Sequence, residues 1–399
     1  MGLMMQRSIW IIIICAGSIM GLAVGFRQSL GLFLTPITLD LGLGRESFAL
    51  GMGMMNLFWG VGSPIAGAIA DQYGAGRVVV FGGFAYAVGL LVLTVSGDGE
   101  QLWIGGALIG LGLSGCGFSV ILGTVGRMAD EAHRGQMLGL VSVGGSVGQF
   151  MALPYTHMLM DGFGWSVALV ILAGTVALCI PLAGGAAGAP ANDGGVPLNL
   201  ITTAKLALKV PSFWLLNAGF FVCGFHLAFV AVHMPAFLAD QGFDIWLGTA
   251  ALTMIGFTNI MGSYIFGILG DVYAKKNILS FLYVARSGVF LLFILVPISE
   301  VTVLVFSAAI GFLWLGTVPL TSGIVAQLFG TRYMSMLFGL VFLGHQFGGF
   351  LGAWLAGWLF DIFGSYDSMW WISIILGIMS AAVHWPISER AVTLVADPV

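Results

Sequence analysis

Long apolar stretches separated by short polar segments follow one another along the whole chain. A stretch of about 20 residues is long enough to cross the hydrocarbon core of a bilayer as a helix. Twelve such spans can be placed, near 9–38, 46–70, 77–96, 102–126, 136–160, 165–185, 212–239, 246–270, 277–298, 301–326, 335–360 and 367–387. The pattern therefore predicts an all-α membrane protein with twelve transmembrane helices.

One polar interruption is much longer than the others. It runs from Gly184 to Lys209 and is rich in Gly, Ala, Pro, Asn and Asp, as expected of a linker. We expect an N-terminal six-helix bundle over 1–186, a cytoplasmic linker over 187–209 and a C-terminal six-helix bundle over 210–399.

The two predicted bundles carry the same sequence pattern. GAIADQYGAGR at 67–77 recurs as GILGDVYAKK at 267–276, and Gly139-Leu140-Val141 recurs as Gly339-Leu340-Val341. Gly25-Phe26 matches Gly224-Phe225, with an offset of 199. A repeat with an even number of helices keeps one orientation, so we expect two pseudo-symmetric bundles related by an axis along the membrane normal.

The basic residues predict the orientation of the chain in the membrane. If the N-terminus is inside, ten basic residues fall on inner segments: Arg7, Arg77, Arg127, Arg134, Lys205, Lys209, Lys275, Lys276, Arg332 and Arg390. Arg45 falls outside, and Arg27 and Arg286 lie within spans. Because basic residues stay preferentially on the cytoplasmic side, we expect both termini in the cytoplasm and the protein in the inner membrane.

Composition narrows the class of protein. Apolar residues make up 59% and charged residues 8% of the chain, and the formal net charge is −4. This composition indicates a lipid bilayer as the surroundings and gives no reason to expect a nucleic-acid partner. The four cysteines lack the spacing of metal ligands, and the sequence shows no nucleotide-binding motif and no catalytic constellation. We therefore expect no metal, no cofactor and no enzymatic activity. The N-terminal apolar run is too long for the core of a signal peptide and predicts an uncleaved first span.

The loop between spans two and three carries a recognisable motif. It reads G-x-x-x-D-x-x-G-x-x-R, with Gly67, Asp71, Gly74 and Arg77, and it resembles the signature of the major facilitator superfamily. Gln72 stands where that signature usually has a basic residue, and the second copy around Asp271 is degenerate. The resemblance covers the whole chain and implies the major facilitator fold, with Asp71, Arg77, Arg127 and Asp271 as candidates for a cytoplasmic gate.

A narrower resemblance is to the monocarboxylate transporter and oxalate–formate antiporter branch. It rests on LALK followed by PSFWLL at 206–216 and on GFRQSLGLFLTPI at 25–37. Many members of this branch have a lysine on the first helix, and that position aligns with Gln28, next to Arg27. Members also carry an arginine on span eight, where this chain has Asn259 and Ser263, so their proton-coupled mechanism does not transfer directly.

Arg27 is the principal candidate for substrate binding. It lies about 19 residues into the first span, about 28 Å along a helix. A cation at this depth is costly unless it faces a cavity or a negative partner. Every acidic residue falls at or beyond a span end, so we expect a basic cavity that selects anions. A structural arginine capped by backbone carbonyls is the alternative.

Other polar residues within spans extend this candidate site. The repeat places His226 at the position of Arg27, and His345-Gln346 replaces Gly145-Ser146 of the first half. The full set of candidate substrate-binding residues is Arg27, Gln28, Asn56, Tyr155, His226, Asn259, Trp314, His345 and Gln346. Arg286 and His233 are candidates for either a charge at the cavity or a structural role.

These residues predict a secondary transporter that moves a small organic anion, a monocarboxylate or related carboxylate, by alternating access. Protons could accompany the anion through His226 or His345, or the protein could exchange anions. We expect a monomer. One alternative is an efflux transporter of hydrophobic or zwitterionic compounds, suggested by a partial antiporter-type motif at 144–148. Another is a non-transporting membrane sensor.

Overall fold

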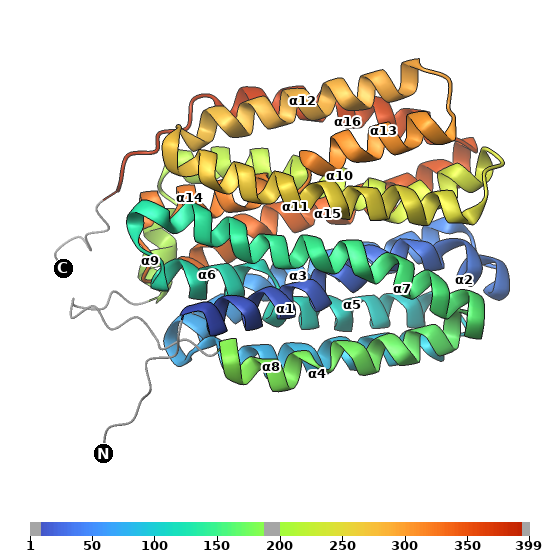
Figure 1. Ribbon diagram of the computed structural model, residues 1–399, viewed down its shortest axis with the longest axis horizontal. Coiled ribbons are helices and arrows are strands. Elements are labelled where there is room, and N and C mark those ends of the chain that lie inside the picture. The colour runs from blue at the N-terminus through green and yellow to red at the C-terminus, as the bar shows by residue number, and fades with distance from the viewer. Residues whose placement is uncertain (1–8, 187–199, 393–399) are drawn as a thin grey trace.

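The computed structural model describes residues 9–186 and 200–392, and it is helical throughout, without strands over these residues (Figure 1). The expected linker falls partly outside the described residues, at 187–199. The rest of it contains the helix α9 (Leu200–Ala207), which the polar composition of the segment did not predict.

The first half contains α1 (Ile9–Ser29), the 3-10 turn η1 (Leu30–Phe33), α2 (Leu34–Leu41), α3 (Arg45–Tyr73), α4 (Ala75–Thr94), α5 (Gly99–Cys116), α6 (Phe118–Met128), the 3-10 turn η2 (Glu131–His133), α7 (Arg134–Val176) and α8 (Cys179–Ala186). The second half contains α10 (Pro211–Asp240), α11 (Ile245–Val272), α12 (Lys275–Leu295), α13 (Glu300–Phe312), α14 (Thr317–Phe329), α15 (Met334–Phe363) and α16 (Asp367–His384).

These helices confirm the predicted spans. Ten helical stretches of the described chain are long and apolar enough to cross a membrane. One of them, Glu131–Gly185, supplies the fifth and the sixth span, because α7 turns at Gly164, where φ is 77°. A positive φ of this kind favours glycine, which has no Cβ to clash with the backbone. The second span, α3, is not among the ten but is long enough to cross at 29 residues.

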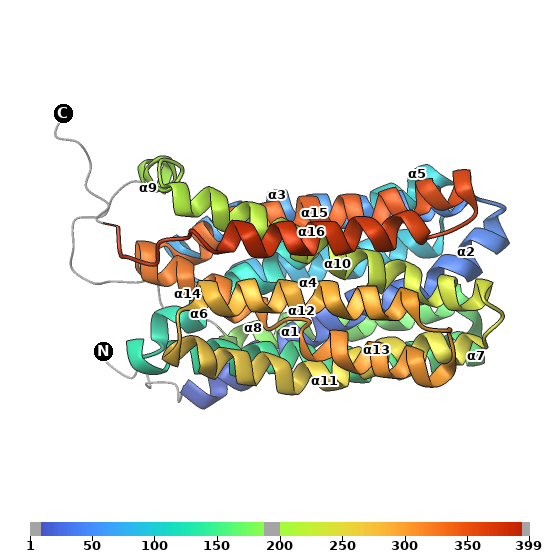
Figure 2. The ribbon, with the colours of Figure 1, turned by 90° about the horizontal axis from the view of Figure 1, so that it is seen from above.

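The two halves lie side by side and meet along two pairs of helices. In Figure 2, α3 of the first half lies beside α15 of the second, and α7 and α11 form the other contact. We call the end of the molecule that holds α9 the α9 end, and the opposite end, which holds α2, the α2 end. Helices α1, α7, α10 and α15 start at the α9 end, whereas α3 and α11 finish there.

Glycines of the sequence repeat allow both pairs of helices to pack closely. A Cβ on Gly67 of α3 would lie 2.4 Å from the carbonyl oxygen of Ser335 at the start of α15. A Cβ on its counterpart Gly267, on α11, would lie 2.9 Å from the carbonyl oxygen of Gly135 at the start of α7. In lipid, helix association relies on this kind of close backbone packing. The repeated motif therefore holds the same kind of contact in both seams between the halves.

Four spans are interrupted within the described bundle. The first changes to the 3-10 turn η1 directly after Ser29, and the fourth breaks at Gly117 between α5 and α6. The sixth breaks between α7 and α8, and the tenth breaks between α13 and α14. A break leaves backbone N–H and C=O groups without helical partners. Polar side chains are therefore needed beside these breaks, and the candidate site begins there.

Candidate functional site

Arg27 lies on α1, two residues before the span changes to a 3-10 turn, and its side chain is 6% exposed. Its Nη2 donates to Oδ1 of Asn56 on α3 at 3.1 Å, and its guanidinium carbon lies 5.8 Å from the centre of the Trp59 ring. Its Nε is buried and has no hydrogen-bond partner. The charge of Arg27 is thus held by a neutral amide and an aromatic face.

No carboxylate balances Arg27 in the described part of the chain. The ion pairs there join Arg45 to Asp240, Arg127 to Asp71 and His157 to Asp161. Asp71 is the only buried carboxylate among the described residues, and it lies near the end of α3 at the α9 end. A buried cation without a counter-ion is strongly destabilising, so this position favours a bound anion.

Several neighbouring polar groups also lack partners. Gln28, next to Arg27, is fully buried, and neither its Oε1 nor its Nε2 makes a hydrogen bond. The indole Nε1 of Trp59 and the Nε2 of Gln346 are likewise buried and unpaired. Buried polar groups in folded proteins are normally hydrogen-bonded, and exceptions call for an explanation such as a ligand site.

The second half contributes His345 and Gln346 of α15. Nδ1 of His345 lies 2.8 Å from Oε1 of Gln346, and its ring stacks on Phe342 with 4.9 Å between the ring centres. Phe342 in turn lies 5.1 Å from Trp59, and Gly60 of α3 packs against the Cβ of Gln346. The structure therefore brings this pair to the seam with α3, near Trp59, the aromatic neighbour of Arg27.

Asn259 lies at the other seam. Its Nδ2 donates to Oε1 of Gln149 on α7 at 3.1 Å, and its Oδ1 accepts from the backbone N–H of Leu315 at 2.9 Å. Asn259 thus joins the two halves and satisfies an N–H group at the break between α13 and α14. This position fits a structural link as well as the substrate contact that the sequence predicted.

Arg286 lies on α12, and its side chain reaches the same break. Its Nε donates to the carbonyl of Leu313 at 3.0 Å, its Nη2 donates to the carbonyls of Leu313 and Trp314, and its Nη1 lies 3.4 Å from the sulfur of Cys223. Its Nε and Nη2 thus satisfy backbone carbonyls that the break leaves without helical partners. These contacts fit a structural role for Arg286, and its positive charge also lies inside the second half.

Two candidates lie elsewhere than the sequence predicted. His226 does not face Arg27: its Nε2 lies 2.8 Å from the carbonyl of Ser373 on α16, and its ring packs edge-on against Phe290 of α12. Tyr155 does not wall a central cavity but is 37% exposed in a groove between α1 and α7. Trp314 is fully buried at the break in the tenth span, and its Nε1, like that of Trp59, has no hydrogen-bond partner.

Asp71 and Asp271 occupy equivalent places at the α9 end. The carboxylate of Asp71, on α3, accepts from the backbone N–H of Ser335 at 3.3 Å and of Met336 at 2.9 Å, at the start of α15, and pairs with Arg127. The carboxylate of Asp271, on α11, accepts from the backbone N–H of Gly135 and Gln136 at the start of α7, both at 2.9 Å. Arg77 is exposed near the start of α4.

Each of these carboxylates caps a helix N-terminus of the opposite half. The N–H groups there are unsatisfied by the helix itself and carry a partial positive charge, which an acidic side chain stabilises. The two seams are thus closed at the α9 end by the same interaction. No group of three or more His, Cys, Asp or Glu residues suited to a metal ion occurs among the described residues.

Sequence reasoning missed two parts of this arrangement. Trp59 and Gln149 were not recognised, because a tryptophan or glutamine in a span gives no signal of which neighbour it faces. Arg45, Asp240 and Tyr366, which form a polar network at the α2 end, were also missed. A signal existed for Arg45, since it is the one basic residue that the orientation rule placed outside.

Comparisons with known proteins agree with this fold. Residues 9–353 match the model of the Major Facilitator Superfamily. The chain is 26% identical to monocarboxylate transporter 13 of Rattus norvegicus over 373 residues, which cover 90% of this chain and 84% of that protein. It is 24% identical over 359 residues to the uncharacterized MFS-type transporter YhjX of Escherichia coli (strain K12), with 86% of each chain covered. The chain thus belongs to the Major Facilitator Superfamily and is a multi-pass membrane transporter, not an enzyme.

Proposed function

We propose that this transporter carries a small organic anion, a monocarboxylate or related carboxylate, bound at Arg27. The observation that supports this most is a buried guanidinium without a carboxylate partner, next to polar groups of Gln28 and Trp59 that make no hydrogen bond. A guanidinium offers a carboxylate two parallel N–H donors, which fits planar anions better than a single ammonium does. Similarity to proteins named monocarboxylate transporters points to the same class of substrate.

In the proposed site the two halves share the substrate. Arg27, Gln28 and Asn56 would hold the carboxylate from the first half, and His345 and Gln346 would approach it from the second. The two halves, residues 1–186 and 210–399, would then rock about this site. The rocking would expose the site alternately to the two sides of the membrane. We propose that the protein does this as a monomer.

The glycines that suggested an efflux transporter have a packing role in this structure. A Cβ on Gly144 would lie 2.4 Å from the Cα of Gly17, and a Cβ on Gly148 would lie 2.1 Å from the carbonyl oxygen of Gly21. The motif at 144–148 therefore lets α7 approach α1 closely. This packing role does not depend on the class of substrate that is carried.

The coupling of transport can be tested at His345, the candidate histidine that lies at the seam between the halves. Uptake of a labelled carboxylate into proteoliposomes should show whether transport depends on pH. If a proton moves through His345, His345→Gln should remove the pH dependence and leave exchange of anion for anion intact. A pH profile like that of the wild type would rule out His345 as the proton carrier, and absence of any carboxylate uptake would contradict the proposed function itself.

We also propose that the α9 end faces the cytoplasm and that the protein resides in the inner membrane. Arg77, Arg127, Arg134, Lys275 and Lys276 all lie near this end, whereas Arg45 lies at the α2 end. Basic residues concentrate on the cytoplasmic side of membrane proteins.

Labelling of single cysteines in whole cells should test this orientation. A membrane-impermeant thiol reagent should react with a cysteine at Gly97, which is exposed in the loop at the α2 end, and not with one at Asp130, which is exposed at the α9 end. Cys15, the only partly exposed native cysteine, should first be replaced by serine. Labelling at position 130 but not at position 97 would reverse the proposed orientation.

A further inference from the structure

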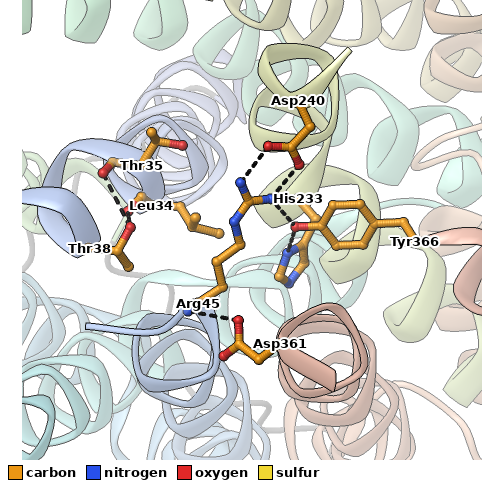
Figure 3. A network of polar contacts seen from close by, with 8 residues as sticks. All are labelled: Leu34, Thr35, Thr38, Arg45, His233, Asp240, Asp361 and Tyr366. Atoms are coloured by element: carbon orange, nitrogen blue, oxygen red, sulfur yellow. Dashed lines mark hydrogen bonds and ion pairs between the residues drawn. The ribbon is translucent and has the colours of Figure 1, made fainter. Parts of the chain in front are cut away.

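Arg45 is the first residue of α3 and reaches across the α2 end to the second half. Its Nη1 and Nη2 each lie 2.7 Å from one carboxylate oxygen of Asp240, the last residue of α10 (Figure 3). This two-point geometry is the strongest form of an arginine–carboxylate pair. The pair is partly shielded, with side-chain exposures of 17% for Arg45 and 31% for Asp240.

Further contacts of the same arginine also go to the second half. Nη1 donates to the hydroxyl of Tyr366 at 2.9 Å, and the guanidinium carbon lies 3.9 Å from the centre of the Phe360 ring. The carboxylate of Asp361 accepts from the backbone N–H of Arg45 at 3.3 Å and of Glu46 at 2.8 Å. The start of α3 is therefore bound to the second half both through the charged side chain of Arg45 and through two backbone N–H groups.

Tyr366 connects this network to the interior of the second half through His233. Nε2 of His233 lies 2.8 Å from the carbonyl of Ala353, which can only accept, so Nε2 carries the proton. In the neutral ring Nδ1 then accepts from the hydroxyl of Tyr366, 3.1 Å away, and the oxygen of Tyr366 accepts from Arg45 (Figure 3). Each donor in this series therefore meets an acceptor, from Arg45 through Tyr366 and His233 to the carbonyl of Ala353. His233 thus holds Tyr366 in position for Arg45.

The remaining corner between the halves, where α7 meets α11 at the α2 end, is built differently. By the repeat, Asp161 is the counterpart of Asp361 and would cap the start of α11. Instead it lies 3.4 Å from Nε2 of His157 and is exposed, and Asp244 caps α11 from within its own half. Among the described residues one hydrogen bond crosses this corner, between His157 and Thr249 at 3.2 Å, and the centre of the His157 ring lies 5.8 Å from that of Trp246.

Carboxylates of Asp71, Asp271 and Asp361 thus cap helices across three corners, and the fourth lacks such a cap. We propose that the network of Arg45, Asp240, Asp361, Tyr366 and His233 is the latch that closes the α2 end, and that opening of this end begins with release of Arg45 from Asp240. Release of Arg45 allows α3 to move away from α10, α15 and α16 together. At the corner between α7 and α11, few interactions have to break for the α2 end to open. The latch acts on the conformation of the protein and does not depend on which substrate is carried.

The latch can be tested by distance measurements on the full-length protein in lipid. Spin labels on cysteines at Gly97, in the loop after α4, and at Glu300, the first residue of α13, are exposed, lie in opposite halves and report on the α2 end. Labels at Gln72 and Tyr273 report on the α9 end. Arg45→Gln and Asp240→Asn should each move most of the population at the α2 end to longer distances, and leave the α9 end unchanged. Glu100→Gln removes an exposed charge at the same end and should have no effect.

The double variant Arg45→Gln/Asp240→Asn should open the α2 end no further than either single change, because both remove the same interaction. Tyr366→Phe keeps the ring and the ion pair between Arg45 and Asp240 but removes the two hydrogen bonds of the hydroxyl, to Arg45 and to His233. It should therefore give a smaller shift, and it serves as the test if the charge variants do not fold. The proposal would be overturned if the label distances at the α2 end stayed at their wild-type values in both Arg45→Gln and Asp240→Asn. Wild-type distances in Tyr366→Phe alone would overturn it too. Since no substrate is added, this result is independent of the anion proposal.

Discussion

Replacing Arg27 by alanine is expected to abolish measurable carboxylate binding while the protein still folds. Removing one partner of a buried, hydrogen-bonded charge pair typically costs about 2–5 kcal/mol, which corresponds to a loss of affinity between about 30-fold and about 4,000-fold. Stability should not fall by a comparable amount, because the empty site of the wild type holds an uncompensated cation that alanine removes. Isothermal titration of the purified protein would measure the affinity, and thermal unfolding would measure the stability.

Two further variants separate the charge of Arg27 from its shape. Arg27→Lys keeps the charge and loses the two-point geometry, so affinity should fall partly, between the wild type and Arg27→Ala. Arg390→Gln removes an exposed arginine at the α9 end and should bind like the wild type. Unchanged affinity in Arg27→Ala would show that this arginine does not contact the substrate.

Asp71→Asn is expected to slow transport severely while leaving substrate binding measurable. The substitution removes the negative charge that pairs with Arg127 and that caps the start of α15. Arg127 is then left shielded and unpaired, and breaking such a pair from one side costs about 3–5 kcal/mol. Because this contact joins the two halves at the α9 end, the cost falls on the conformation in which that end is closed.

A shift of about 3–5 kcal/mol changes the ratio of the two conformations by about 100-fold or more, in favour of the conformation that is open at the α9 end. We therefore expect spin labels on cysteines at Gln72 and Tyr273, exposed positions in opposite halves at the α9 end, to lie farther apart in Asp71→Asn than in the wild type. Asp130→Asn, an exposed aspartate at the same end, serves as the control. If binding is lost in Asp71→Asn while turnover per bound substrate is normal, the carboxylate does not act as a gate.

The helical framework was predictable because lipid leaves the backbone few choices. Each span needs a continuous apolar run, and each end needs polar or basic residues, so the bounds of twelve spans could be read within a few residues. The interruptions inside spans were not predictable in this way. The break between α13 and α14 lies in a run, LWLGT at 313–317, that is as apolar as its surroundings. For this reason the carbonyl partners of Arg286 could not be foreseen.

The wrong placement of His226 has a simple geometric origin. The repeat has an offset of 199 at Gly25 and of 200 at Gly67, and the 3-10 turn η1 interrupts the first span between them. One residue on a helix corresponds to a rotation of about 100°. An alignment that is right to one residue can therefore assign a side chain to the wrong face, and here it placed a residue packed against α12 and α16 opposite Arg27.

The Arg45 network shows a different limit. The sequence marked Arg45 as an unusual basic residue on the outer side, but its partners Asp240 and Tyr366 are far away in sequence. Long-range pairs of this kind are fixed by the packing of whole helices, which one sequence does not determine. Arg27 could be identified because its chemistry is local: a cation deep within an apolar span needs a reason to be there.

The central claim is that the site at Arg27 selects the charged carboxylate group. The most direct measurement is thermal stabilisation of the purified wild-type protein by a panel of small carboxylates, each paired with its own amide. A ligand that binds only the folded protein stabilises it by RT ln(1 + [L]/Kd), so at a fixed ligand concentration the unfolding temperature rises with affinity. We predict that at least one carboxylate stabilises the wild type, that its amide does not, and that the difference disappears in Arg27→Ala. Equal stabilisation by a carboxylate and its neutral amide, or stabilisation that persists in Arg27→Ala, would contradict the claim.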